Sequence, residues 1–223
     1  MRHCHDPGAR KALREARWEG KFRNDACSPT ADCCARLLFS RQVWSPFAEC
    51  WSEQHPEIEL WCPDLPGFGD AERPPGMLPN LSAYGRWLAE EAVHRSQGRP
   101  FVLLGHSLGG SVVLHAEAHL RQREQPGLTG VVLLAAGGGI YQPRPFRRLR
   151  SFGRLILELR PDALGRLPPP VGELGPFKAE RRAARGLLVN STSRGAVRDL
   201  PGLVSELEVA SLWISGDRDQ VME

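Results

Sequence analysis

The sequence predicts an α/β fold whose mostly parallel sheet is covered by helices on both faces. Short apolar runs alternate with longer segments of helical periodicity, and Phe101–Leu104 and Val131–Ala136 are the clearest of these runs. They are continuously apolar, which is typical of strands buried on both faces of a parallel sheet. A Gly-x-Ser-x-Gly pentapeptide, Gly105–Gly109, directly follows the first run. A chain of 223 residues is long enough for one such domain.

The composition is ordinary for a globular protein. Hydrophobic residues make up 41% and charged residues 25% of the chain. No apolar run approaches the roughly 18 residues of a membrane span, and no N-terminal apolar segment resembles a secretory signal. We therefore expect no transmembrane segment and a cytoplasmic location. The net charge of +3 is too small to indicate a nucleic-acid partner, and the oligomeric state stays open.

The cysteines are concentrated near the N-terminus, which favours free thiols. Four of the six fall in the first 34 residues and none in the last 161, whereas a secreted disulfide scaffold spreads them through the fold. A metal site is a minor alternative, because no paired Cys-x-x-Cys spacing is present. The residues with ligand chemistry at this end are His3, Cys4, His5, Cys27, Cys33 and Cys34.

The chain divides into an N-terminal segment, 1–34, and an α/β domain, 35–223. The first segment is polar, rich in arginine and cysteine, and without sustained helical or strand periodicity. One hypothesis is that it arises from an upstream start or a shifted reading frame and is not the natural beginning of the fold. From residue 35 onward the sequence consists of apolar runs and amphipathic segments.

Five strands and three helices are expected in the regular part of the domain. The expected strands are Ala35–Phe39, Ile58–Cys62, Phe101–Leu104, Val131–Ala136 and Val209–Ser215. The expected helices run from Val43 toward Glu53, from a cap at Asn80 or Ser82 to Gly98, and from about Leu108 to Arg123.

Residues from about 141 to 205 interrupt the alternation and predict a cap insertion. Three consecutive prolines, 168–170, separate a helical stretch at 146–159 from another near 177–188. An insertion above the carboxyl ends of the strands would cover the active site and select the substrate. It is basic, with thirteen Lys and Arg against five Asp and Glu between residues 141 and 200. We interpret these basic residues as a solvent-exposed helix face, in preference to a binding site for an acidic substrate or a contact with an anionic membrane.

Ser107 is the candidate nucleophile. The pentapeptide stands where a buried strand turns sharply into a helix, a strained turn that projects the serine Oγ outward. Gly105 and Gly109 lack the Cβ atoms that would clash where strand and helix cross. The helix N-terminus stabilises developing negative charge. A chance match is conceivable in a chain with 23 glycines, but the apolar strand before it and the apolar helix after it favour a functional serine.

A nucleophilic serine needs a base and an orienting carboxylate. The turn after the last expected strand offers two carboxylates, Asp217 and Asp219, at the same edge of the sheet. Asp219 is favoured because a residue or two is needed after Gly216 before a side chain can point back across the edge. Both could instead cap a following helix. His115 and His119 share a helix face, and we expect them to be partly buried structural histidines.

Three motifs give the chain from about residue 36 to 223 a resemblance to the α/β-hydrolase superfamily, particularly its small cap-bearing serine hydrolases. In the family's order and approximate spacing they are Asp64-Leu-Pro-Gly-Phe-Gly69, Gly105-His-Ser-Leu-Gly-Gly110 and Trp213-Ile-Ser-Gly-Asp-Arg-Asp219. The resemblance implies Ser107 as nucleophile, Asp219 as triad acid and the backbone N–H of Leu108 as half of the oxyanion hole. It also implies a small-molecule substrate with an ester or similar acyl bond, an acyl-enzyme, and no metal or organic cofactor. The family calls the sharp strand-to-helix turn at Gly105–Gly109 the nucleophile elbow, and a serine there, in place of aspartate, counts against the dehalogenase and epoxide-hydrolase branches.

The sequence departs from the family pattern at two places. The family's histidine follows the acid, beyond a final strand, and none of the seven histidines here is expected to replace it. We therefore expect an incomplete, truncated chain, which could be inactive. A His-Gly pair normally supplies the second oxyanion donor, whereas here Ser40 and Arg41 follow Phe39, which leaves the backbone N–H of Ser40 as the candidate.

Three functions remain as alternatives to a serine hydrolase that cleaves an acyl bond. They are a non-catalytic binding or regulatory protein, a carbon–carbon bond hydrolase and a cofactor-free haloperoxidase.

Overall fold

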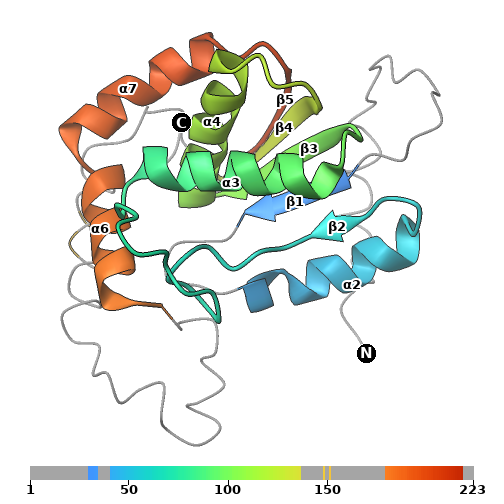
Figure 1. The fold of residues 1–223 in the computed structure, drawn as a ribbon, viewed down its shortest axis with the longest axis horizontal. Coiled ribbons are helices and arrows are strands. Elements are labelled where there is room, and N and C mark those ends of the chain that lie inside the picture. Colours follow the sequence, from blue (N-terminus) through green and yellow to red (C-terminus); the bar gives the residue numbers. More distant parts are fainter. Residues whose placement is uncertain (1–29, 35–40, 137–147, 149–150, 152–178, 218–223) are drawn as a thin grey trace, which may run out of the picture.

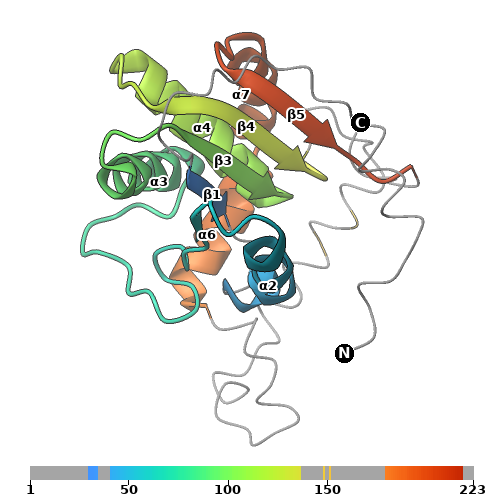
Figure 2. The same ribbon diagram turned by 90° about the vertical axis from the view of Figure 1, so that its right-hand side faces the viewer.

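The computed structural model is a parallel β-sheet with helices on both of its sides (Figures 1 and 2). The residues that it describes are 30–34 (backbone only), 41–136, 148, 151 and 179–217. Five strands lie in the order β2-β1-β3-β4-β5, and every neighbouring pair is parallel. The strands are β1 (Thr30–Cys34), β2 (Leu60–Trp61), β3 (Phe101–His106), β4 (Leu128–Leu134) and β5 (Ala210–Ile214). The predicted fold class is confirmed.

The three helices expected in the regular part are present as α2 (Ser45–Gln54), α3 (Leu81–Ser96) and α4 (Leu108–Gln122). α6 (Arg181–Ser191) overlaps the helical stretch expected near 177–188, and the 3-10 helix η1 (Arg41–Trp44) and α7 (Arg194–Ser205) are further helices that the sequence did not predict. α3 and α4 pack against each other on one side of the sheet, and α2 lies on the other (Figure 2). Of the two caps considered for α3, Asn80 is the one used, because its side chain accepts a hydrogen bond from Ala83 N at 2.8 Å.

The first strand differs from the expectation. The apolar run at 35–39 lies outside the described residues, and the strand that joins the sheet is β1, inside the segment expected to be irregular. β1 lies between β2 and β3, with Thr30 opposite Phe101 and Cys34 opposite Gly105. Strand pairing is made by backbone N–H and C=O groups, so a stretch without an apolar run can supply it. The sheet therefore begins before the expected boundary at residue 35.

Of the predicted insertion, the structure describes mainly the second half, residues 179–205. The helical stretch at 146–159 and the three prolines lie outside the described residues, apart from isolated positions. α6 packs against α3, and α7 packs against α4. Leu200 of α7 is buried, because that face of the helix completes the core. α7 therefore packs into the helical layer beside the sheet, and the cap assignment of the insertion stays a prediction.

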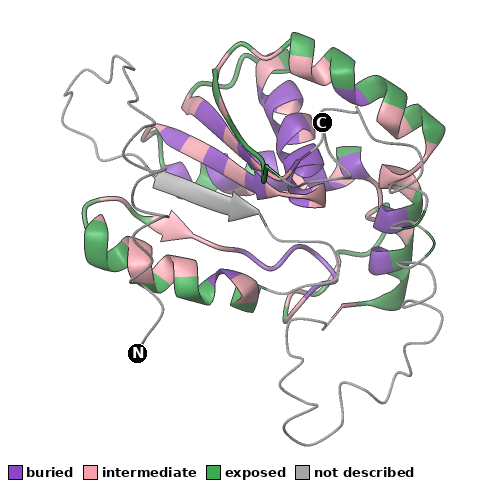
Figure 3. Cartoon of the chain, turned by 180° about the vertical axis from the view of Figure 1, so that it is seen from behind, coloured by how far each residue is buried: buried purple, intermediate pink, exposed green. Residues whose placement is uncertain are grey.

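The core lies between β3, β4 and the pair α3–α4 (Figure 3). Side chains along β3 alternate between buried and intermediate, so this strand is not equally buried on its two faces. β5 is mostly exposed, and its Trp213 and Ile214 are 38% and 45% exposed. The helices thus bury the middle of the sheet far better than its β5 edge. None of the described helices has both the length and the apolar character to cross a membrane.

Candidate active site

Ser107 lies at the junction between β3 and α4 in a strained conformation. Its backbone angles are φ 55° and ψ −119°, although a non-glycine residue rarely adopts a positive φ. Its N–H donates to Leu134 O at 2.8 Å, and its carbonyl accepts from Gly110 N at 3.0 Å. The sharp strand-to-helix turn predicted from the pentapeptide is therefore present. Residues held in such angles cluster at functional sites.

The glycines of the pentapeptide allow β3 and α4 to meet closely. A Cβ on Gly105 would lie 2.5 Å from Gly109 O and 2.6 Å from Gly110 N, too close for any real side chain. A Cβ on Gly110 would overlap Ala136 beyond the end of β4. The expected role of Gly105 is confirmed, and the backbone of Gly109 is one of the groups that require it. A direct need for glycine at position 109 stays a prediction.

The Ser107 hydroxyl is not used to cap its helix. Ser107 is the N-cap residue of α4, and its side chain makes no capping hydrogen bond. Among the other described helices, Glu180 of α6 makes no capping bond, but Asn80 Oδ1 accepts one from Ala83 N at 2.8 Å and Ser193 Oγ accepts one from Ala196 N at 3.1 Å. Both have extended backbone angles, which direct the side chain to the first turn of the helix. The different angles of Ser107 leave its Oγ without this partner.

The ends of β3, β4 and β5 are joined directly at this edge of the sheet. Ala135, just beyond β4, has a φ of 43°, and its N–H donates to Ile214 O at 2.7 Å. Ser107 and the turn after β5 are therefore separated by β4 alone, or about 10 Å at two strand spacings. Asp217 lies in that turn. Asp219 lies outside the described residues, so its role stays a prediction.

The structure describes one of the two expected oxyanion donors, Leu108, and not the other, Ser40. Leu108 is the first residue of α4, where helix N–H groups have no partner within the helix and the helix dipole favours negative charge. Ser40 lies outside the described residues. Arg41 follows it at the start of η1, and its N–H donates to Asp64 Oδ1 at 2.6 Å.

Comparisons with known proteins agree with this geometry. The family model described as "Alpha/beta hydrolase family" matches residues 37–223, which is most of the chain. The chain belongs to the alpha/beta hydrolase family. The resemblance inferred from the three motifs is thereby confirmed. No curated protein matches the sequence significantly.

Solved alpha/beta hydrolase structures share the fold at low sequence identity. A bromoperoxidase from Bacillus anthracis is 14% identical, with a TM-score of 0.65 over 86% of this chain and 75% of that one. A structure described as a putative aryl esterase from Burkholderia cenocepacia is 22% identical, with a TM-score of 0.58 over 89% and 74%. An N-acyl homoserine lactonase bound to N-butanoyl homoserine is 16% identical, with a TM-score of 0.58 over 88% and 73%.

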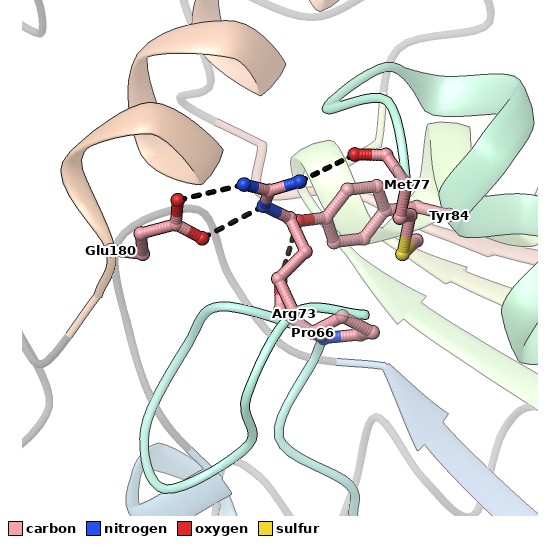
Figure 4. Close-up of polar contacts among 5 residues, drawn as sticks. All are labelled: Pro66, Arg73, Met77, Tyr84 and Glu180. Carbon is pink, nitrogen blue, oxygen red and sulfur yellow. Dashed lines mark hydrogen bonds and ion pairs between the residues drawn. The ribbon is translucent and has the colours of Figure 1, made fainter. Parts of the chain in front are cut away.

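In this alpha/beta hydrolase the loop that follows β2 is held to the segment that leads into α6 (Figure 4). Arg73 makes a two-point ion pair with Glu180, from Nε to Oε2 at 2.8 Å and from Nη2 to Oε1 at 2.9 Å. This hydrogen-bonded contact lowers the pKa of the Glu180 carboxyl. Glu180 N also donates to Gly67 O at 2.6 Å, and Tyr84 Oη donates to Pro66 O at 2.5 Å. No motif or spacing in the sequence indicated these contacts.

The described histidines near the elbow have separate surroundings. The His106 ring meets the Trp44 ring edge-on, with 6.4 Å between centroids. His115 and His119 are partly buried on α4, and burial lowers the pKa of both. A Cβ on Gly85 of α3 would approach His115 Cβ to 2.5 Å, so His115 stands at the closest crossing of α3 and α4. This agrees with a structural role for His115.

Proposed function

We propose that this chain is a serine hydrolase that cleaves an ester or similar acyl bond through an acyl-enzyme at Ser107. The observation that carries the proposal is the backbone of Ser107, φ 55° and ψ −119°, at a junction where its hydroxyl does not cap the helix. Such strain persists only where the surroundings enforce it, and here it presents an oxygen at the edge of the sheet. Membership of the alpha/beta hydrolase family supports the same chemistry.

In the proposed reaction, Ser107 Oγ attacks the substrate carbonyl carbon and gives its proton to a base. The resulting oxyanion accepts a hydrogen bond from Leu108 N–H at the positive end of α4. The leaving alcohol takes a proton, and water then hydrolyses the acyl-enzyme. Asp219 is proposed to orient the base, with Asp217 as the alternative. Within the described part of the chain no hydrogen bond reaches the Ser107 hydroxyl, so the base has to be found by experiment.

A small-molecule ester or lactone is the proposed substrate class. This proposal is supported by two structural neighbours, of which one is described as a putative aryl esterase and the other as an N-acyl homoserine lactonase. A cofactor-free haloperoxidase is the second candidate, since a bromoperoxidase is also among the neighbours. The role of the insertion as a cap that selects the substrate stays a prediction.

The test is covalent labelling by a fluorophosphonate probe together with hydrolysis of p-nitrophenyl acetate. We expect the probe to label Ser107 and the Ser107→Ala variant to lose both labelling and hydrolysis. Ser193→Ala is the matched control, because Ser193 is also an N-cap serine, and it should retain both. A folded chain that neither reacts with the probe nor hydrolyses the ester would contradict the proposal and support a binding protein.

The same assay assigns the acid. Replacing a triad aspartate by asparagine lowers turnover by about 10⁴-fold in a well-studied serine protease. We expect a loss of this order for Asp219→Asn and a much smaller one for Asp217→Asn. The reverse pattern would assign the acid to Asp217. Histidine-to-glutamine variants, measured in the same way, would identify the base.

A further inference from the structure

We propose that Asp64 is a positioning residue, which fixes the start of η1 and thereby holds Trp44 against the residue that precedes Ser107. The inference rests on the proposed function of Ser107, but it concerns a different part of the molecule. Asp64 does not touch the reacting atoms in this proposal. It acts through two contacts, from its carboxylate to η1 and from η1 to the elbow.

The Asp64 carboxylate is a buried acceptor with backbone partners from two loops. Its side chain is 3% exposed. Oδ1 accepts from Arg41 N at 2.6 Å, and Oδ2 accepts from Asp70 N at 3.1 Å. Gly69 leaves the space for it, since any Cβ there would overlap the carboxylate. A buried carboxylate bound by N–H groups from both sides fixes the distance between the two loops.

η1 carries this constraint to the elbow. It has only four residues, Arg41–Trp44, so a shift at its first residue moves its last one. The Trp44 side chain is buried, and its ring meets that of His106 with an interplanar angle of 83°. His106 is the last residue of β3 and is bonded directly to Ser107. The contact between Trp44 and His106 therefore bears on the backbone that sets the direction of Ser107 Oγ.

The loop that carries Asp64 is itself held in place. Tyr84 from the buried face of α3 donates to Pro66 O, and Glu180 N donates to Gly67 O (Figure 4). Phe68 is fully buried and packs edge-on against the Tyr84 ring, with 6.3 Å between centroids. These contacts make the loop a fixed support, so Asp64 restrains η1 and does not merely follow it.

The Arg41 guanidinium offers a test of which part of the contact matters. Its Nη1 lies 3.7 Å from Asp64 Oδ2, but the Arg41 side chain is 57% exposed. Exposed ion pairs contribute little, whereas the backbone N–H bond is short and ends on a buried carboxylate. Arg41→Gln removes the ion pair and keeps the N–H donor, so it is the matched control.

The experiment compares Asp64→Ala, Asp64→Asn and Arg41→Gln with the parent chain. Two quantities are measured: the rate constant for fluorophosphonate labelling of Ser107, and amide hydrogen exchange at residues 41–44 and 106–110. For Asp64→Ala we expect labelling to slow about tenfold, because small displacements of a reacting group have large effects on rate. Exchange should become faster in both segments. Asp64→Asn keeps one carbonyl acceptor and should recover part of both effects, and Arg41→Gln should stay within about twofold of the parent.

The two readouts separate this inference from the proposed function. If Ser107 is labelled in the parent and Asp64→Ala labels equally fast, the inference is wrong and the hydrolase proposal stands. If Ser107 is never labelled, the proposed function fails and exchange alone decides the positioning role. Faster exchange in Asp64→Ala at 106–110 as well as 41–44 then supports the inference. A change confined to 41–44, or none at all, overturns it.

Discussion

Two of the described helices have a serine as their N-cap residue, and the two serines do opposite things. Ser193, before α7, has φ −71° and ψ 153°, and its hydroxyl accepts a hydrogen bond from Ala196 N at 3.1 Å. Ser107, before α4, has φ 55° and ψ −119° and makes no such bond. The same residue type at the same helix position is thus a cap in one place and a candidate nucleophile in the other. The backbone angle decides between the two roles.

The surroundings explain why the angles differ. α7 follows α6 after a short turn, so its first residue can take the extended angles that capping requires. α4 starts directly after a central strand and has to fold back over it, and Ser107 N is tied to Leu134 O of the neighbouring strand. Ten of the fifteen residues of α4 are buried, against one of twelve in α7. The packing of α4 therefore supplies the stabilisation that offsets the strain at Ser107.

The largest expected effect comes from breaking the close contact that imposes the Ser107 angles. Gly105→Ala places a Cβ against the backbone of Gly109, which cannot move without lifting α4 off the sheet. We expect the free energy of unfolding to fall by about 3 kcal/mol or more, as in overpacked cores. Chemical denaturation followed by circular dichroism measures it, and loss of soluble folded protein is the extreme form of this result.

The matched control for Gly105→Ala is Gly202→Ala in α7. A Cβ at Gly202 meets nothing within 4 Å, and alanine is the better helix former. The control should leave stability unchanged or raise it by up to about 1 kcal/mol. Similar losses at the two glycines would mean that the close approach of β3 and α4 does not impose the elbow.

The next effect isolates the strain at Ser107 itself. Ser107→Gly and Ser107→Ala both remove the hydroxyl, but only glycine adopts a positive φ without a steric penalty. We expect Ser107→Gly to be more stable than Ser107→Ala by about 1 kcal/mol. Thermal and chemical unfolding of the two variants compare them directly. Equal stability would mean that the serine backbone is not strained.

A smaller effect on stability distinguishes Ser193, which caps its helix, from Ser107, which does not. Ser193→Ala removes the bond to Ala196 N and should lower the free energy of unfolding by about 1 kcal/mol. Ser107→Ala removes no capping bond and should have almost no effect. If Ser107→Ala is as destabilising as Ser193→Ala, then the Ser107 hydroxyl has a structural partner after all.

Sequence reasoning located the elbow because its signals are local. An apolar run, Gly105, the serine and an apolar helix follow one another within about twenty residues, and each has a fixed local consequence. The same holds for Asn80, whose cap bond spans three residues. Features of this kind can be predicted without knowing what packs around them.

The parts that sequence reasoning missed depend on residues far apart in the chain. Asp64 and Arg41 are 23 residues apart, and Arg73 and Glu180 are 107 apart. Nothing in the local sequence indicates which arginine will meet which carboxylate. The strand β1 at Thr30–Cys34 was missed for a related reason, because the apolar content of a stretch says little about which backbone pairs with β3.

The smallest expected effect concerns a histidine on α4, the buried helix that Ser107 precedes. Burial lowers the pKa of His115 below its usual 6.5, although the charge of Asp199 on α7 acts in the other direction. His115 is thus neutral in the folded protein at pH values where the unfolded chain already takes up a proton. Stability contributed by the neutral ring is complete above pH 6.5 and is lost as the pH falls toward the folded-state pKa.

Replacing His115 tests this predicted direction of the pH dependence of stability. In His115→Gln the free energy of unfolding should fall less steeply between about pH 7 and pH 5 than in the parent, because the group that protonates only on unfolding is gone. Gln122→Ala, at an exposed position of α4, changes no titratable group, so it is the control and should keep the parent slope. Urea unfolding at a series of pH values measures the slopes. An equal slope in the parent and in His115→Gln would show that burial of His115 does not control its protonation.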